Sequence, residues 1–258
     1  MNAQNQQAYD RGITIFSPDG RLYQVEYARE AVTQGAPVAG VRGADGVALA
    51  AHVPRRSPLV EVDSVEKLHA VDGRVGVASA GHAADARRLV DICRRAAQGE
   101  RLRYGEAPTV ESLATTVADH VQEHTQTGGA RPYGTALLVA GYDDRPRLFE
   151  TDPSGATREW RADAVGRGAG GIVDYFEEHY EPGLDTEGAL ALVLDGLASA
   201  VDDLDPSAAD PPAADPPAAD TSADDAPTDG VATIDAATID ADGYAPVPAE
   251  RIAATFDG

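Results

Sequence analysis

Short apolar runs separated by turn residues occur twice in the first third of the chain, and they predict two β-hairpins. Asp72-Gly73 separates one pair of runs, and a link with glycine at both ends separates the other. Such links between apolar runs are typical of tight connections between antiparallel strands. The two hairpins are Pro37–Arg42 with Val47–Val53, and Val65–Val71 with Val75–Ala80.

Helical periodicity follows the hairpins, and the two patterns then alternate. Apolar residues recur at spacings of three and four from His82 to Arg103 and from Val110 to Thr125, which predicts two consecutive helices. The later elements are expected as strands at Thr135–Tyr142, Arg147–Thr151 and Trp160–Gly166, helices at Ile172–Tyr180 and Thr186–Val201, an edge strand at Val231–Ile239 and a last helix at Pro248–Phe256.

This order of elements favours an α+β fold. Two packed antiparallel sheets with helices on both outer faces, a four-layer αββα sandwich, would bury the apolar face of every element. We expect one such domain, formed by residues 13–201 and 231–258, preceded by a flexible tail at residues 1–12.

An acidic segment interrupts the domain at residues 202–230. It holds nine Asp, eight Ala and six Pro and no basic residue, and Ala-Ala-Asp-Pro-Pro is repeated at Ala208–Pro212 and Ala213–Pro217. Such a composition cannot bury enough apolar surface to offset the entropy of ordering the chain. We expect a disordered insertion that acts as a solvating spacer.

The charge of the chain excludes several classes of partner. The net charge is −22, and Lys67 is the only lysine beside 20 arginines. Nucleic acids and anionic membranes would repel such a chain. A surface rich in Asp and poor in Lys suits solvation in concentrated salt, which indicates a halophilic origin. One cysteine and the lack of an apolar leader or spanning segment predict a cytoplasmic protein.

Other motifs in the chain give only weak indications of a binding or catalytic site. The glycine-rich loop Gly166–Gly171 is expected to be a strand-to-helix turn and not a phosphate site, because the Lys-Ser/Thr of a P-loop is missing. His120 and His124 share a helix face and could bind a metal, but without a third ligand a solvated face is favoured. Cys93 lies on an apolar face and is expected to pack there. No cofactor is expected.

The N-terminal region carries a more specific pattern. Tyr9-Asp10-Arg11 and the stretch from Thr14 to Val32 strongly resemble the N-terminal signature of α-type subunits of the proteasome core particle, here of a haloarchaeal kind. Supporting resemblances lie at Ser64–Lys67, Ala80-Gly81, Ala84–Arg87, Gly128–Gly134 and Asp152–Gly155.

This resemblance implies the fold of N-terminal nucleophile hydrolases, with an extra helix across the open end of the sandwich. Leu22, Val25, Ala28 and Val32 form the apolar stripe expected of that helix, after a turn at Ser17–Gly20. Activity in this fold needs a processed N-terminal Thr, and none stands near Gly35-Ala36-Pro37. The chain should therefore be catalytically silent, although Lys67 matches the position of the catalytic Lys in active β-type relatives.

The resemblance also implies a role in controlling access to a proteolytic chamber. Family α subunits form a heptameric ring that stacks on β-type subunits, closes the axial pore and receives activating ATPases. The matching gate residues are Tyr9, Asp10, Arg11, Pro18 and Tyr27. The residues that match, or lie near, the pocket for the C-terminal tail of the ATPase are Lys67, Gly81, Glu26, Arg29 and His82. The alternatives are a catalytically active N-terminal nucleophile peptidase, and a ring without a proteolytic partner.

Overall fold

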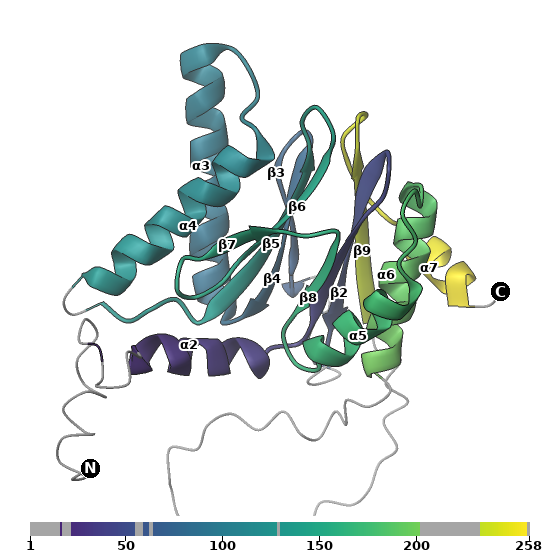
Figure 1. Cartoon of the computed structure of the whole chain (residues 1–258), viewed down its shortest axis with the longest axis horizontal. Helices are drawn as coiled ribbons and strands as arrows, with labels where there is room; N and C mark the ends of the chain where they lie inside the picture. The colour runs from purple at the N-terminus through teal and green to yellow at the C-terminus, as the bar shows by residue number, and fades with distance from the viewer. Residues whose placement is uncertain are drawn as a thin grey trace, which may run out of the picture.

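The computed structural model describes residue 16 and residues 22–54, 59–61, 64–127, 130–201 and 233–256. Two antiparallel sheets face each other at its centre, and helices cover both outer faces (Figure 1). The predicted α+β sandwich is therefore confirmed.

The first sheet has the strand order β10-β9-β2-β1-β8. Its strands are β1 Val38–Arg42, β2 Gly46–Val53, β8 Ala162–Val165, β9 Thr233–Asp240 and β10 Tyr244–Pro246. The second sheet has the order β3-β4-β5-β6-β7. Its strands are β3 Leu68–Asp72, β4 Val75–Gly81, β5 Thr135–Tyr142, β6 Pro146–Thr151 and β7 Thr157–Glu159. Both predicted hairpins are present, as β1–β2 and β3–β4.

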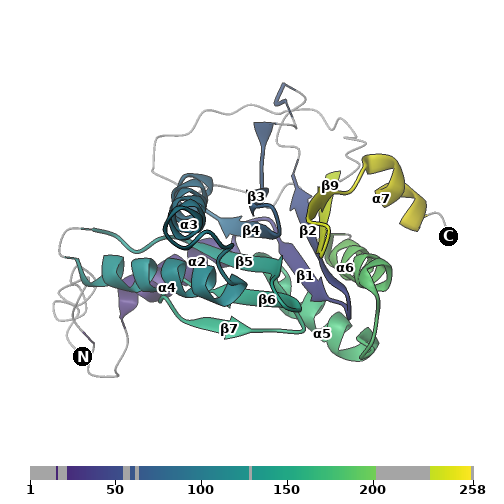
Figure 2. The same ribbon diagram turned by 90° about the horizontal axis from the view of Figure 1, so that it is seen from above.

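The helices form two layers and one crossing element (Figures 1 and 2). One layer, against the second sheet, contains α3 Ala83–Tyr104 and α4 Val110–Gln126. The other, against the first sheet, contains α5 Ala169–His179 and α6 Thr186–Val201, with α7 Ala249–Phe256 packed beside α6. The remaining helix, α2 Tyr23–Thr33, crosses one end of the sandwich.

Small side chains bring the layers close together. Ala39, Ala48 and Ala50 of β1 and β2 are buried in the cluster that contains Leu194 and Leu197 of α6. A second cluster fills the space between the sheets, and a third joins the second sheet to α3 and α4. Cys93 is fully buried in the third cluster, so its predicted packing role is confirmed.

The prediction of an edge strand near the C-terminal end is wrong. β9 pairs with β2 along eight residues on one side and with β10 on the other, so it lies inside the sheet. β10 is the actual edge, and Pro246 at its end suits an edge position because proline cannot donate to a further strand. The sequence pattern missed β10 and β7 because each has only three residues.

The structure tests the predictions for the glycine-rich loop and for the pair His120 and His124. The glycine-rich loop is a strand-to-helix turn, with Gly166 and Gly168 at φ +112° and +69° and Gly168 preceding α5. His120 and His124 do not form a simple solvated face, because both are half-buried against the ring of Tyr133. Nε2 of His120 lies 3.0 Å from the Tyr133 hydroxyl.

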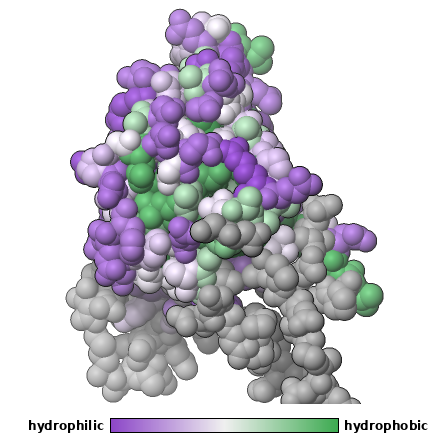
Figure 3. Space-filling model, turned by 90° about the vertical axis from the view of Figure 1, so that its right-hand side faces the viewer, coloured by the Kyte–Doolittle hydropathy of each residue, from purple (hydrophilic) through white to green (hydrophobic). Residues whose placement is uncertain are grey.

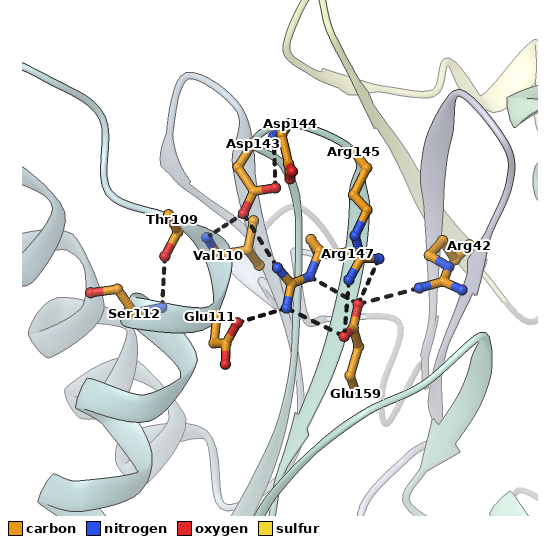
Figure 4. Close-up of polar contacts among 10 residues, drawn as sticks. All are labelled: Arg42, Thr109, Val110, Glu111, Ser112, Asp143, Asp144, Arg145, Arg147 and Glu159. Atoms are coloured by element: carbon orange, nitrogen blue, oxygen red, sulfur yellow. Dashed lines mark hydrogen bonds and ion pairs between the residues drawn. The ribbon is translucent and has the colours of Figure 1, made fainter.

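The two sheets are also joined by ion pairs along one margin of the sandwich (Figure 4). The carboxylate of Glu159 on β7 accepts hydrogen bonds from Arg42 of β1 and from Arg145 and Arg147. Arg147 also pairs with Glu111 at the start of α4, at 2.8 Å. Pairs in direct contact survive concentrated salt, which screens charges beyond about 3 Å at 1 M.

Asp163 on β8 is a buried acid with an unpartnered carboxylate oxygen, Oδ2. Burial, with a smaller contribution from the negative charge of Glu150, raises the pKa of Asp163 to about 7. Because the unfolded chain has the ordinary value near 3.8, the unfolded state binds fewer protons between these values. Stability should therefore fall as the pH rises from about 4 to 7.

We expect Asp163→Asn to be increasingly stabilising over that pH range, because the amide never ionises. The increase in the free energy of unfolding should reach at most about 4 kcal/mol near pH 7 and stay constant above that pH. Denaturant unfolding in molar salt at pH 4.5, 6 and 7.5 would measure it. The exposed Asp174→Asn is the matched control, and a gain independent of pH would contradict the prediction.

Candidate functional site

The candidate site lies at the end of the sandwich that α2 crosses. Val25, Ala28 and Val32 of α2 are buried, and the helix packs against β4 and β5. The predicted apolar stripe is therefore confirmed at these positions, while Leu22 is the half-buried residue before the helix. The predicted turn at Ser17–Gly20 lies outside the described residues.

A salt bridge fixes α2 to the second sheet. Arg29 donates to Oδ2 of Asp152, in the turn between β6 and β7, at 2.8 and 3.1 Å. It also pairs with Glu26 at 2.9 Å. Arg29 thus holds the helix against the sheet, while Glu26 pairs with it inside the helix. A part of either residue in activator docking remains a prediction.

The corner between β4 and α3 depends on three glycines. Gly81 has φ +107°, and a side chain there would collide with the carbonyl oxygen of Gly134. A side chain on Gly35 would in turn collide with the backbone of Gly81. The backbone at the end of α2 therefore lies directly against the predicted pocket residue Gly81. His82 follows it as the exposed residue that precedes α3, and its N–H donates to Gly134 at 2.8 Å.

Lys67 lies between this corner and the segment that leads into β1. Its ammonium donates a hydrogen bond to the carbonyl oxygen of Ala36, and its own carbonyl accepts from Ser79 of β4 at 3.0 Å. Burial lowers the pKa of Lys67 to about 7. Within the described residues no carboxylate forms an ion pair with it.

The structure brings together basic residues that the sequence pattern did not relate, with His52 close to both Lys67 and Arg167. His52 of β2 has a buried Nδ1 without a partner, and its pKa is lowered to about 4 by burial and then by the positive charges of Lys67 and Arg167. Arg167, after β8, donates to the carbonyls of Gly35 and Gln34 at 2.7 and 2.9 Å. The positions of His52, Lys67 and Arg167 along the chain do not predict that His52 lies close to the other two, because the packing of the strands creates this arrangement.

The predicted gate residues are mostly outside the described part of the chain. This holds for Tyr9, Asp10, Arg11 and Pro18. Tyr27 is described, and 52% of its surface is exposed on α2. The described residues therefore contain one member of the predicted gate, on the helix that crosses the end of the sandwich.

Other parts of the described chain offer little chemistry. An open hollow of about 520 Å³ lies at the opposite end of the sandwich and is lined by residues such as Arg101 and Asp72, which pair with each other. Among the described residues no group of three His, Cys, Asp or Glu side chains is placed to hold a metal ion.

No helix in these ranges is long and apolar enough to span a membrane. The face seen in Figure 3 is mainly hydrophilic, with a smaller central hydrophobic area.

Two facing sheets lie between helix layers, and a lysine amine lies beside the segment that leads into β1. This arrangement places the domain in the class of N-terminal nucleophile hydrolase folds. Comparison with protein families agrees with that class. Residues 32–209 match the proteasome subunit family, and residues 9–31 match the N-terminal signature of its A-type subunits. The chain belongs to the proteasome subunit family and is an α-type member of it.

Several curated relatives are similar over most of the chain. The proteasome alpha 2 subunit of Haloarcula marismortui is 59% identical over 204 residues, which span 79% of this chain and 84% of the relative. The proteasome alpha subunit of Natronomonas pharaonis is 59% identical over 77% of this chain and 78% of its own. That of Halobacterium salinarum is 56% identical over 79% and 81%. These haloarchaeal sources agree with the halophilic origin that the acidic composition indicates.

Proposed function

We propose that the chain is a non-catalytic subunit of the outer, heptameric ring of a cytoplasmic proteasome core particle. The ring stacks on β-type subunits, controls the passage of substrates to the proteolytic chamber, and receives an activating ATPase through its C-terminal tail. Residues 1–12 act as the gating tail, residues 13–201 and 231–258 form the domain, and residues 202–230 act as a solvating spacer.

One observation carries the non-catalytic part of this proposal. The amine of Lys67 is directed at Ala36, which has no hydroxyl or thiol to serve as a nucleophile. The chain also continues backward from Ala36 into α2, so no free α-amine is present at that point. Nucleophilic catalysis in this fold requires both groups. Cys93 does not replace them, because burial raises the pKa of its thiol to about 12.

The docking part rests on the surroundings of Lys67. One of its three N–H groups is used by the Ala36 carbonyl, and the nearby His52 ring is neutral at pH 7 because its pKa is lowered to about 4. A partly desolvated ammonium without a carboxylate partner favours an incoming carboxylate. The C-terminus of an activator tail supplies such a group.

The gating part rests on α2. The helix is fixed to the sandwich by its apolar stripe and by the Arg29–Asp152 pair, so the tail that precedes it starts from a rigid base. Exposed Tyr27 on the same helix provides a surface on which a tail can be held.

We expect deletion of residues 2–12 to raise hydrolysis of short peptides by the assembled particle several-fold. A polar, Gln-rich tail can obstruct a pore yet contributes little packing, so assembly should be unaffected. Peptide turnover by the full particle, with negative-stain imaging of the seven-fold ring, would measure both effects.

The α chain purified without β-type subunits provides the control for catalysis. It should cleave no peptide, with or without its tail. Unchanged hydrolysis by the truncated particle would contradict the gating role. Turnover by the α chain alone, lost on mutation of one Ser or Thr, would instead support an active peptidase.

A further inference from the structure

We propose that a carboxylate binding at Lys67 is accompanied by uptake of one proton from solvent by the Lys67 amine. This inference rests on the proposed docking role and concerns its regulation. Tail binding would then depend on pH near neutrality, which docking at an ordinary surface lysine would not do.

The first step of the argument is the desolvation of the amine. The Lys67 side chain is partly buried beside the segment that leads into β1, with His52 of β2 nearby. Its ammonium donates to one backbone carbonyl, that of Ala36. Burial of this kind disfavours the charged form of an amine, and it lowers the pKa of Lys67 to about 7.

The second step is the charge of the neighbouring groups. From β2, the nearby ring of His52 has a pKa lowered to about 4, so it is neutral at pH 7. From the loop after β8, the positive charge of Arg167 acts on the His52 ring. On the same segment as Lys67, the carboxylate of Glu66 is exposed and lies 3.5 Å from Nδ1 of His69. β4 contributes the N–H of Ser79, which bonds the Lys67 backbone. No described carboxylate is therefore placed to hold the proton on the amine.

The third step is the effect of a ligand. A carboxylate in contact with the amine favours its charged form and raises its pKa well above neutrality. Below pH 7 the amine is already charged, so binding takes up little proton and the affinity is constant. Above pH 7 each binding event must also take up a proton from solvent, and the fall in affinity approaches tenfold per pH unit. An ordinary lysine, with a pKa near 10.4, would show no such fall before about pH 10.

Isothermal titration calorimetry on the assembled particle tests the proposal. The probe is an N-acetylated peptide with the last eight residues of a proteasome-activating ATPase, and the same peptide with a C-terminal amide is the ligand control. Titrations in molar KCl at pH 6 and pH 8, each in two buffers with different ionisation enthalpies, count the protons bound. We expect little uptake at pH 6, close to one proton per peptide at pH 8, and about tenfold weaker binding at pH 8 than at pH 6.

Lys67→Arg is the matched variant, because a guanidinium stays charged at every pH used. At pH 6 this variant should bind the peptide more weakly than the unaltered particle does. It should take up no proton, and its affinity should stay the same from pH 6 to pH 8. Equal affinity and no uptake at pH 8 in the unaltered particle would overturn the proton linkage and leave docking intact. A carboxylate peptide that binds no better than its amide at any pH would overturn docking and the linkage together.

A second measurement uses the fact that Lys67 is the only lysine in the chain. Incorporation of lysine labelled with ¹³C at Cε gives one side-chain resonance, whose chemical shift follows the protonation of the amine. In the free protein we expect it to titrate near pH 7 and to move to a higher pH when the carboxylate peptide is added. Titration of the free protein near pH 10 would overturn the proposal even if the peptide binds.

Discussion

Replacing Lys67 by alanine is expected to abolish ATPase-stimulated degradation of folded proteins. The substitution removes the ammonium beside Ala36, which is the group that we propose meets the incoming carboxylate. Losing one partner of a desolvated charged pair costs roughly 2–5 kcal/mol, which is at least a tenfold loss of affinity. Degradation of a folded substrate by the particle with its ATPase, in molar salt, would measure the effect.

Two comparisons separate docking from damage to the fold. Lys67→Ala particles that also lack residues 2–12 should hydrolyse short peptides as fast as truncated particles with Lys67, because an open pore needs no activator. Lys67→Arg should recover only part of the stimulation, since a wide guanidinium fork fits a site built for a compact ammonium poorly. Normal stimulation of both variants would exclude a docking role for Lys67.

Replacing Asp85 by alanine is expected to cause a large loss of stability. Asp85 lies in the first turn of α3, and its buried carboxylate accepts two hydrogen bonds from Arg131 at 2.6 and 2.8 Å and one from the N–H of Gly134 at 2.9 Å. Without it, the buried N–H of Gly134 is left unpaired. We expect a loss of about 3 kcal/mol in the free energy of unfolding.

The pH dependence of this loss provides a further check. Burial by itself raises the pKa of Asp85, but the hydrogen bonds from Arg131 and Gly134 outweigh it and lower the pKa below its ordinary value of 3.8. The stabilisation is therefore complete above about pH 4 and is lost as the pH falls through the lowered value. Denaturant unfolding of the Asp85→Asn and wild-type chains should converge there. Because Gly134 also contacts Gly81 and His82, Asp85→Ala should weaken activator docking as well.

Arg131→Gln is the matched control for that network. Most of the Arg131 side chain is exposed, so it returns to water when its partner is lost, whereas Asp85 is buried. The arginine variant should lose less stability than Asp85→Ala, because the Gly134 N–H keeps its acceptor. A larger loss in Arg131→Gln would show that the ion pair, and not the backbone hydrogen bond, stabilises the corner.

The elements that depend on local periodicity were predicted well from the sequence. The faces of α3 and α4 follow from apolar residues such as Leu89, Cys93, Leu113 and Val117, all of which are buried. The β1–β2 and β3–β4 hairpins follow from their short glycine-containing links. These elements are predictable because neighbouring residues decide which face of a helix or strand is apolar. β3 nevertheless begins at Leu68 and not at Val65 as predicted.

What the sequence by itself determined is the family signature, the helices and hairpins, and the lysine at position 67 as the candidate docking residue. Only the tertiary structure decided that β9 lies inside its sheet, and that the Ala36 carbonyl and His52 lie beside the Lys67 amine. The reason is physical: pairing between strands nearly 200 residues apart, and the removal of water from a side chain, depend on how the whole domain packs. The sequence identifies the lysine, and the packing lowers its pKa to a value near neutrality.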